Sequence, residues 1–172
     1  MKKLFVPAFM AVLFLSATSC SAQADKSKRP SPPAEATATT ADGNKITINY
    51  SQPALKGRAV GTNLATYGKV WRTGANEATV FEISKDATIA GQALPAGKYG
   101  LYTIPGEKEW TVIFSKTWDT WGTNYAEKDD ALRVKAKAAK AGETMERFTV
   151  MVDKSGMVNM VWGDTKVDFA VK

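Results

Sequence analysis

Hydrophobic and polar residues alternate with a period of two over most of the chain beyond residue 42. Ile46, Ile48 and Tyr50 alternate with polar neighbours, and the same spacing returns between residues 148 and 152. Because successive side chains of a strand point to opposite faces of a sheet, this pattern predicts half-buried β-strands. Two further runs, 99–104 and 110–114, are apolar at almost every position, which indicates central strands that are covered on both faces.

Turn residues separate these runs and set the fold class. Pro95-Ala96-Gly97 precedes one apolar run, and both 153–156 and Gly163-Asp164 have the composition of hairpin loops. Short strands with regular turns predict an all-β fold, here a jelly-roll-like antiparallel β-sandwich of roughly eight to ten strands over residues 42–172. The segment 131–141 is open to two interpretations: its apolar residues alternate as in a strand, whereas Ala and Lys favour helix. We favour a strand.

The N-terminus has the order of an export signal. Two lysines are followed by an apolar run over residues 4–15 and then by small residues up to Cys20. The run is too short to span a membrane. Ala17-Thr18-Ser19-Cys20 resembles the lipobox of bacterial lipoproteins, which implies a signal peptide over residues 1–19, lipid on Cys20, and a membrane anchor in the cell envelope. An A-x-A pattern leaves open cleavage after Ala24, which would give a soluble periplasmic or secreted protein.

The segment that follows, residues 20–41, has the composition of a tether. It contains small residues, charges and three prolines, but no large apolar side chain. Proline favours an extended chain, and a segment without apolar residues cannot bury enough surface to fold. We therefore expect residues 20–41 to join the anchor to the folded domain without being part of it.

Composition removes several kinds of chemistry. The chain has no histidine, and Cys20 is its one cysteine. This excludes an imidazole base, a nucleophile paired with histidine, and metal sites built from His and thiolate. We expect no catalytic residue, no metal and no cofactor. The net charge of +6 is mild, and part of it lies in the leader, so we expect no nucleic-acid partner.

The first candidate site is the stretch from Trp71 to Glu77. Arg suits the capture of a carboxylate or phosphate, while an indole face with amide and carboxylate neighbours suits a sugar. The alternative is structural: Arg72 would pair with Glu77, Asn76 would cap backbone groups in a turn, and Trp71 would fill the core. The candidate ligand-binding residues are Trp71, Arg72, Asn76 and Glu77.

The second candidate site is the stretch from Trp118 to Tyr125. Three aromatic residues within eight positions, with polar neighbours, are typical of a carbohydrate-binding surface. The alternative is a loop that its large rings pin to the sandwich. The candidate ligand-binding residues here are Trp118, Asp119, Trp121, Asn124 and Tyr125.

Four stretches are distinctive at the level of sequence: YGKVWRTGANEAT at 67–79, LPAGKY at 94–99, TIPG at 103–106 and EWTVI at 109–113. Together they closely resemble a family of bacterial envelope proteins catalogued as domain of unknown function 2911. The resemblance runs from about residue 45 to the end of the chain. It implies an exported or lipid-anchored protein, and it implies no catalytic residue, because the family has no settled activity.

We expect a non-catalytic binding module for a small molecule, a glycan or a protein partner. One alternative is a carboxylate-dependent glycan hydrolase, which needs two acids about 5–9.5 Å apart. A second alternative is a purely structural envelope protein. The acids available to a hydrolase are Glu77, Glu82, Asp119 and Asp168.

Overall fold

The computed structural model describes residues 25–172, which form nine strands and two short 3₁₀ helices. The leader over residues 1–19, Cys20 and the alternative cleavage point at Ala24 lie outside the described residues. None of the helices in residues 25–172 has the length and apolar character needed to cross a membrane. The elements are η1 Lys26–Lys28, β1 Pro33–Thr39, β2 Lys45–Ser51, β3 Thr79–Ile83, β4 Ala87–Ile89, β5 Gln92–Leu94, β6 Gly97–Ile104, β7 Glu109–Ser115, η2 Glu127–Asp129, β8 Asp130–Val152 and β9 Met157–Ala170.

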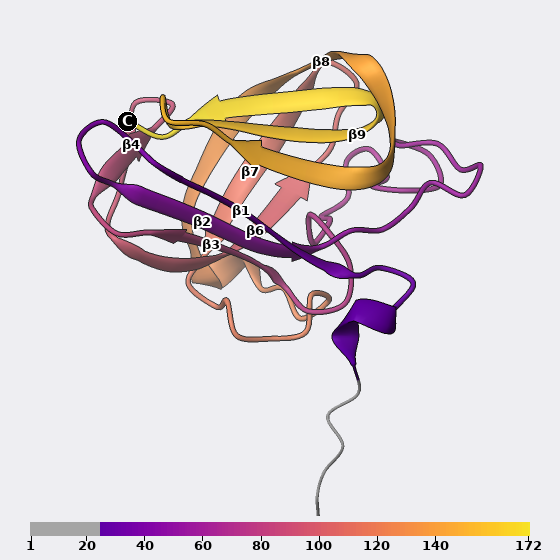
Figure 1. Ribbon diagram of the computed structural model, residues 1–172, viewed down its shortest axis with the longest axis horizontal. Helices are drawn as coiled ribbons and strands as arrows, with labels where there is room; N and C mark the ends of the chain where they lie inside the picture. The colour runs from indigo at the N-terminus through magenta and orange to yellow at the C-terminus, as the bar shows by residue number, and fades with distance from the viewer. Residues whose placement is uncertain (1–24) are drawn as a thin grey trace, which may run out of the picture.

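Seven strands form one antiparallel sheet in the order β1-β2-β3-β6-β7-β8-β9, and β4 and β5 form a separate hairpin. The sheet curls because β8 is long enough to serve two layers. Its first part pairs with β7 as far as Lys137, and its remainder pairs with β9 from Ala138 onward. Figure 1 shows the orange and yellow ribbons of β8 and β9 lying across the indigo strands β1 and β2. The prediction of an all-β antiparallel sandwich is confirmed.

β8 also makes hydrogen bonds to residues outside its two neighbouring strands, and these bonds join the two layers. The residues that follow β2 pair with β8, where the Phe148 N–H donates to the Pro53 carbonyl at 2.9 Å. Nearby, the Val150 N–H donates to the Tyr50 hydroxyl at 3.0 Å. The far half of β8 is therefore held against the first layer.

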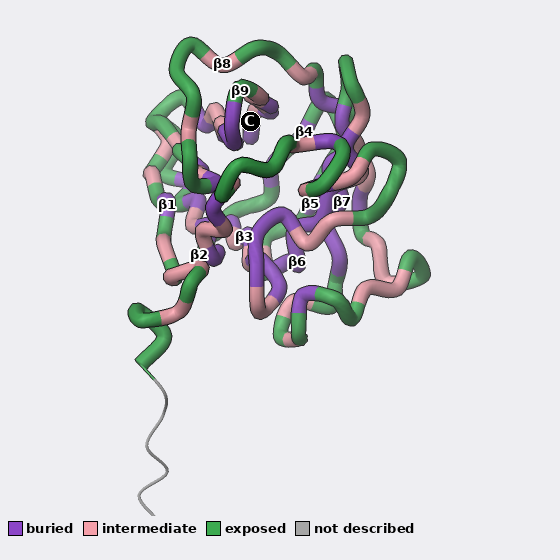
Figure 2. Tube along the Cα trace, turned by 90° about the vertical axis from the view of Figure 1, so that its right-hand side faces the viewer, coloured by how far each residue is buried: buried purple, intermediate pink, exposed green. Residues whose placement is uncertain are grey.

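The main core lies between the layers, and Figure 2 shows the buried stretches of the chain as purple segments within the strands. Aromatic rings from both layers meet there. The Trp71 ring stacks on Trp162, with centroids 5.3 Å apart, and contacts Phe148 and Trp110 edge-on. Further fully buried side chains of this core are Ile46, Ile48, Phe81, Ile83, Leu101, Val112, Phe114, Val158 and Met160.

A second, smaller cluster lies on the outer face of β6 and β7. Tyr102 and Ile113 are cross-strand partners that are almost fully buried, and Ala78, Ile104 and Tyr125 pack around them. This confirms that 99–104 and 110–114 are covered on both faces. The cluster matters for function because Tyr102 and Tyr125 also line the candidate site described below.

The expected tether is wrong over its second half. Residues 33–39 form β1, which pairs with β2 along its whole length, from Pro33 opposite Ser51 to Thr39 opposite Lys45. Backbone hydrogen bonds hold an edge strand even when its side chains are small, and proline is tolerated at the first residue of such a strand. The folded domain therefore begins at least nine positions earlier than the alternation of large apolar residues indicates.

Two predictions about turns had different outcomes. Asp153 to Gly156 does form the turn between β8 and β9, with the Asp153 N–H donating to the Met157 carbonyl at 3.1 Å. Gly163-Asp164 is not a hairpin loop. Gly163 lies inside β9 with a φ of 58°, opposite Met145 at a point where the register shifts. A β-bulge with a glycine in the left-handed region explains the turn-like composition. The segment 131–141 is a strand, as favoured.

Candidate functional site

The two candidate stretches of the sequence lie side by side in the structure. The Ala78 N–H donates to the Thr120 carbonyl, and the Gly122 N–H donates to the Asn76 carbonyl, both at 3.0 Å. Glu77 and Trp121 form an isolated antiparallel bridge between the two segments. Backbone pairing thus brings together residues that are about 45 positions apart.

The turn at 72–77 is strained and is held by buried hydroxyl groups. Thr73 is fully buried with a φ of 49°, a conformation that is unfavourable for a β-branched residue. Its hydroxyl hydrogen-bonds Thr103 at 3.2 Å, and the Thr79 hydroxyl donates to its carbonyl at 2.7 Å. Such strain persists where the surroundings over-determine it, and it clusters at functional sites. The turn places the side chain of Arg72 beside the 120–125 loop.

A hollow of about 290 Å³ opens between these two segments above the outer face of β6. One side comes from the start of the 71–79 stretch, the other from the loop after β7, and β6 contributes a tyrosine. The residues that line it are Val70, Trp71, Arg72, Tyr102, Gly122, Thr123 and Tyr125. Three of the nine candidate residues, Trp71, Arg72 and Tyr125, therefore belong to one site.

Arg72 has no ion-pair partner among residues 25–172. The predicted pair between Arg72 and Glu77 is wrong, because Glu77 turns away to bind cations of the N-terminal segment. The Nε atom of Arg72 is buried and has no hydrogen-bond partner among residues 25–172. Gly122 leaves room for the Arg72 side chain, since a Cβ there would collide with that side chain and lie 2.8 Å from the Asn76 carbonyl oxygen.

Tyr102 is the second group with an unmet hydrogen bond. The residue is 1% exposed, and its hydroxyl has no partner within residues 25–172. Burial raises the pKa of Tyr102, so the phenol stays neutral and can donate. Tyr102 was not predicted as a site residue, because it lies in a continuously apolar strand, where a tyrosine is interpreted as a core residue. Five buried side-chain polar atoms in the described chain lack a partner, and two of them belong to residues lining this one hollow.

Tyr125 forms a fixed wall. Its ring centroid lies 4.9 Å from that of Tyr102, and its hydroxyl donates to Asp130 at 2.8 Å while accepting from Arg133 at 2.7 Å. Burial, together with the carboxylate of Asp130, raises the pKa of Tyr125 to about 12. Both hydrogen-bonding functions of this phenol are therefore occupied, and Tyr125 offers a ligand mainly its ring.

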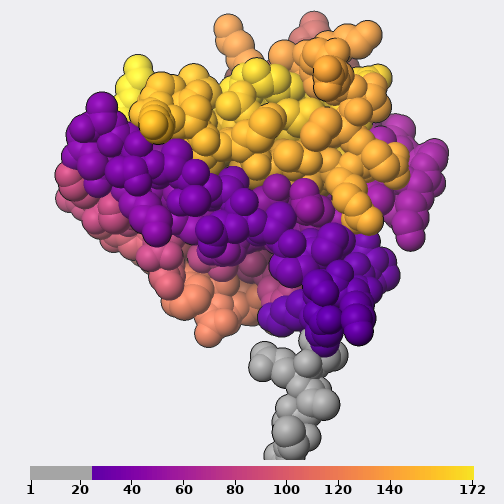
Figure 3. All heavy atoms as spheres, viewed as in Figure 1, coloured from indigo at the N-terminus to yellow at the C-terminus, as the bar shows by residue number. Residues whose placement is uncertain are grey.

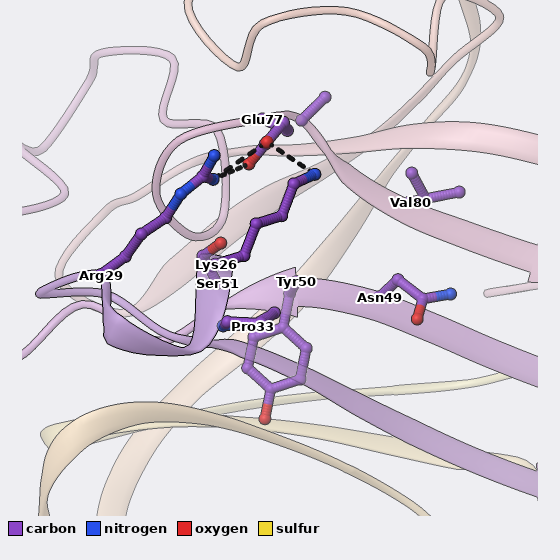
Figure 4. Close-up of a pocket in the computed structure, with 9 residues that line it drawn as sticks. Lys26, Arg29, Pro33, Asn49, Tyr50, Ser51, Glu77 and Val80 are labelled. Atoms are coloured by element: carbon purple, nitrogen blue, oxygen red, sulfur yellow. Dashed lines mark hydrogen bonds and ion pairs between the residues drawn. The ribbon is translucent and has the colours of Figure 1, made fainter. Parts of the chain in front are cut away.

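Residues 25–32 form an N-terminal strap that Figure 3 shows packed against the body of the domain. Arg29 and Lys26 reach Glu77 at 2.9 and 3.1 Å, as drawn in Figure 4, over a hollow of about 180 Å³. Partial burial opposes ionisation of Glu77, but its own backbone N–H and the two cations outweigh this and lower its pKa to about 2. The Asn76 amide donates to the Ser31 carbonyl at 3.1 Å. Asn76 and Glu77 thus hold the strap and do not line the Arg72 hollow.

The other candidates of the second stretch do not line the hollow either. Trp118 is half-buried beneath Lys98, whose ammonium lies 5.2 Å from the ring centroid. The Asn124 amide donates to Thr120 within its own loop at 3.3 Å. Trp121 is 50% exposed, and Asp119 is exposed as well. The three aromatic residues therefore do not form one exposed surface: the Trp118 indole is half-buried, the Trp121 indole is exposed, and the Tyr125 ring lines the hollow.

Three of the four acids considered for hydrolysis, Glu77, Glu82 and Asp168, are engaged separately, and the fourth, Asp119, is exposed. Glu82 pairs with Lys98 at 3.6 Å and Asp168 pairs with Lys166 at 2.9 Å, while the pKa of Glu77 is lowered, the opposite of what a general acid needs. No carboxylate is among the residues lining the Arg72 hollow. Within residues 25–172 no three side chains of the metal-ligating kind come together. The hollow is equipped to bind by hydrogen bonds, charge and ring contact.

Fold and hollow together define an antiparallel β-sandwich domain with a small hollow on the outer face of its sheet. The chain belongs to the family described as Protein of unknown function (DUF2911), whose model matches residues 31–171. The match confirms the family resemblance and includes β1, in agreement with the structure. No curated protein and no solved structure matches the chain significantly.

Proposed function

We propose that this domain is a non-catalytic binding module for a small molecule or a glycan, anchored in the cell envelope by lipid on Cys20. One observation carries the binding role: Arg72 Nε and the Tyr102 hydroxyl are both buried without a partner among residues 25–172, and both residues line the same hollow. Leaving a buried donor unsatisfied costs about 1–3 kcal/mol. A ligand that supplies acceptors explains why two such donors are kept together.

The alternative of a purely structural protein accounts less well for these groups. Elsewhere in the same turn, the buried hydroxyl of Thr79 has a protein acceptor, and the Asn76 amide has two acceptors. Native proteins pair the great majority of their buried polar groups, so exceptions call for an explanation. Here both exceptions belong to residues that line a space large enough for a small ligand.

The envelope location rests on the leader. A basic start, an apolar run and small residues before Cys20 favour export and lipidation. The strap begins only five positions after Cys20, and five extended residues span at most about 18 Å. With lipid on Cys20, the binding module would therefore stand close to the membrane surface rather than at the end of a long tether.

The test is to fill the hollow. Thr123 lines it and is exposed, so Thr123→Trp places an indole there without touching the core. Thr62→Trp, at an exposed position in the 56–69 loop, is the matched control. Mixtures of small sugars, organic acids and amines are added to the protein while amide resonances are recorded by two-dimensional NMR.

We expect wild type and Thr62→Trp to show concentration-dependent shifts at residues 70–72, 102 and 122–125, and Thr123→Trp to lose them. Shifts that map elsewhere, or shifts that survive in Thr123→Trp, would refute a binding role for this hollow. The absence of any shift with all three classes of compound would refute it as well.

A further inference from the structure

We propose that the group bound in the Arg72 hollow is a carboxylate, carried by a small apolar or aromatic body. This inference rests on the proposed function, since it names the ligand class of the same hollow. It follows from the hydrogen-bonding character of the lining, its net charge and the nature of its walls.

The lining is rich in donors. Arg72 can only donate, and the neutral Tyr102 phenol has its O–H to give. The Tyr125 phenol is already occupied by Asp130 and Arg133. Neither aspartate nor glutamate is among the described residues that line the hollow. A ligand that hydrogen-bonds to both of these donors must therefore present acceptors. An oxyanion has several acceptor lone pairs within one small group.

The charge of Arg72 is not compensated by the described part of the chain. None of the ion pairs within residues 25–172 involves it. Glu77, five positions along, is neutralised by Arg29 and Lys26. A partly buried guanidinium favours a counter-ion, and its planar fork matches the two oxygens of a carboxylate. A neutral sugar could accept the hydrogen bonds, but it would leave the positive charge of Arg72 without a counter-ion.

A single negative charge fits better than a phosphate. Phosphate carries up to two charges and is usually held by several cations or by a helix N-terminus. The hollow offers one cation, the Arg72 guanidinium, and no lysine and no helix residue is among its described lining. One carboxylate matches this single positive charge.

The walls indicate an apolar body for the ligand. Val70 is 41% exposed at the hollow, which is unusual for a side chain of this kind in the described chain. The rings of Tyr102 and Tyr125 and the edge of Trp71 supply the rest of the surface. A volume of about 290 Å³ lies at the lower end of ligand pockets, which suits a compact aromatic or aliphatic acid rather than an oligosaccharide.

The experiment compares, on the full chain, three probes that share a phenyl ring: benzoate, benzamide and phenyl phosphate, titrated by calorimetry with NMR shifts to locate binding. Variants are Arg72→Gln and, as a control with the same change in charge, Arg58→Gln in the exposed 56–69 loop. We expect benzoate to bind at least about tenfold more tightly than benzamide. Arg72→Gln should remove that preference, and Arg58→Gln should keep it.

Tyr102→Phe separates binding from folding. It should weaken benzoate binding by at least about threefold without lowering the melting temperature, because the Tyr102 hydroxyl makes no hydrogen bond to residues 25–172 that could be lost. A merely structural tyrosine would not change the affinity.

Three results would overturn the proposal of a carboxylate ligand: equal binding of benzamide and benzoate, no benzoate binding, or a preference for benzoate that survives Arg72→Gln. Tighter binding of phenyl phosphate would overturn it in favour of phosphate. In each case sugars or amines that still shift residues 70–72 and 122–125 would leave the binding role intact. The two proposals therefore fail separately.

Discussion

The residues that matter most here are ordinary in sequence and unusual in their surroundings. From the sequence, Tyr102 is expected to be one more core residue of a central strand, and Arg72 can be interpreted as the partner of Glu77 in an ion pair. In the structure each has a buried polar atom that lacks a hydrogen-bond partner in the described part of the chain. Pattern analysis detects which residues are buried, because burial follows strand periodicity. It does not detect whether a buried polar atom is satisfied, because the partner comes from a different part of the chain.

Tyr102→Phe should raise the free energy of unfolding by about 1 kcal/mol, because it removes a buried hydroxyl that makes no hydrogen bond within residues 25–172. Tyr125→Phe is the contrasting variant, since it loses two formed hydrogen bonds and should lower the stability by about 1–2 kcal/mol. Urea unfolding at neutral pH measures both. Equal destabilisation by the two variants would show that the Tyr102 hydroxyl is satisfied.

Among the elements, the N-terminal strap has no counterpart in the pattern of the sequence. Glu77 binds Arg29 and Lys26 across about 50 positions, and these cations lie in a segment without large apolar residues. Since the turn that ends in Glu77 begins with Arg72, the strap and the hollow share one segment. Removal of the strap contacts should therefore loosen the turn that positions Arg72.

Glu77→Gln should lower the stability by about 1 kcal/mol at pH 7, a modest value because the carboxylate is 39% exposed and screened by solvent. The pKa of Glu77 is about 2 in the folded protein, below its ordinary value of 4.5. A lowered carboxyl pKa stabilises the folded state above 4.5, and this contribution is lost as the pH falls from 4.5 through about 2. The difference between wild type and Glu77→Gln should shrink over that interval.

Glu107→Gln, at an exposed carboxylate outside the ion pairs of residues 25–172, is the control and should change little at any pH. Urea unfolding of the three proteins between pH 2 and pH 7 provides the measurement. A difference between wild type and Glu77→Gln that stays constant down to pH 2 would show that ionisation of Glu77 does not stabilise the strap.

The domain as a whole depends on closure of its curled sheet. β1 covers the edge of β2, and the residues after β2 pair with the far half of β8. An uncovered β2 would present a row of unpaired backbone groups next to the core residues Ile46 and Ile48. The folded unit therefore includes β1, although its side chains contribute little apolar surface.

A chain that starts at residue 42 should melt at a much lower temperature than one that starts at residue 25, and it should associate, because it exposes the edge of β2. A chain that starts at residue 31 keeps β1 and loses the ion pairs of Lys26 and Arg29 and the hydrogen bond from Arg147 to the Pro30 carbonyl, all near the surface, so it should lose only about 1 kcal/mol. Circular dichroism melts and size-exclusion chromatography distinguish the three. Equal melting of the chains from 42 and 31 would mean that β1 does not stabilise the fold.

The alternation of apolar and polar residues was enough to determine the all-β class, the central strands β6 and β7, and the strand at 131–141, because side-chain direction in a strand depends only on local geometry. Tertiary structure alone decided that β1 belongs to the sheet, that Gly163 forms a bulge, and that Glu77 binds the strap. It also decided that Arg72, Tyr102 and Gly122 border one hollow. Backbone pairing and ion pairs join residues that are close in space. Strand register and layer packing determine which residues are close, and a short stretch of sequence does not contain that information.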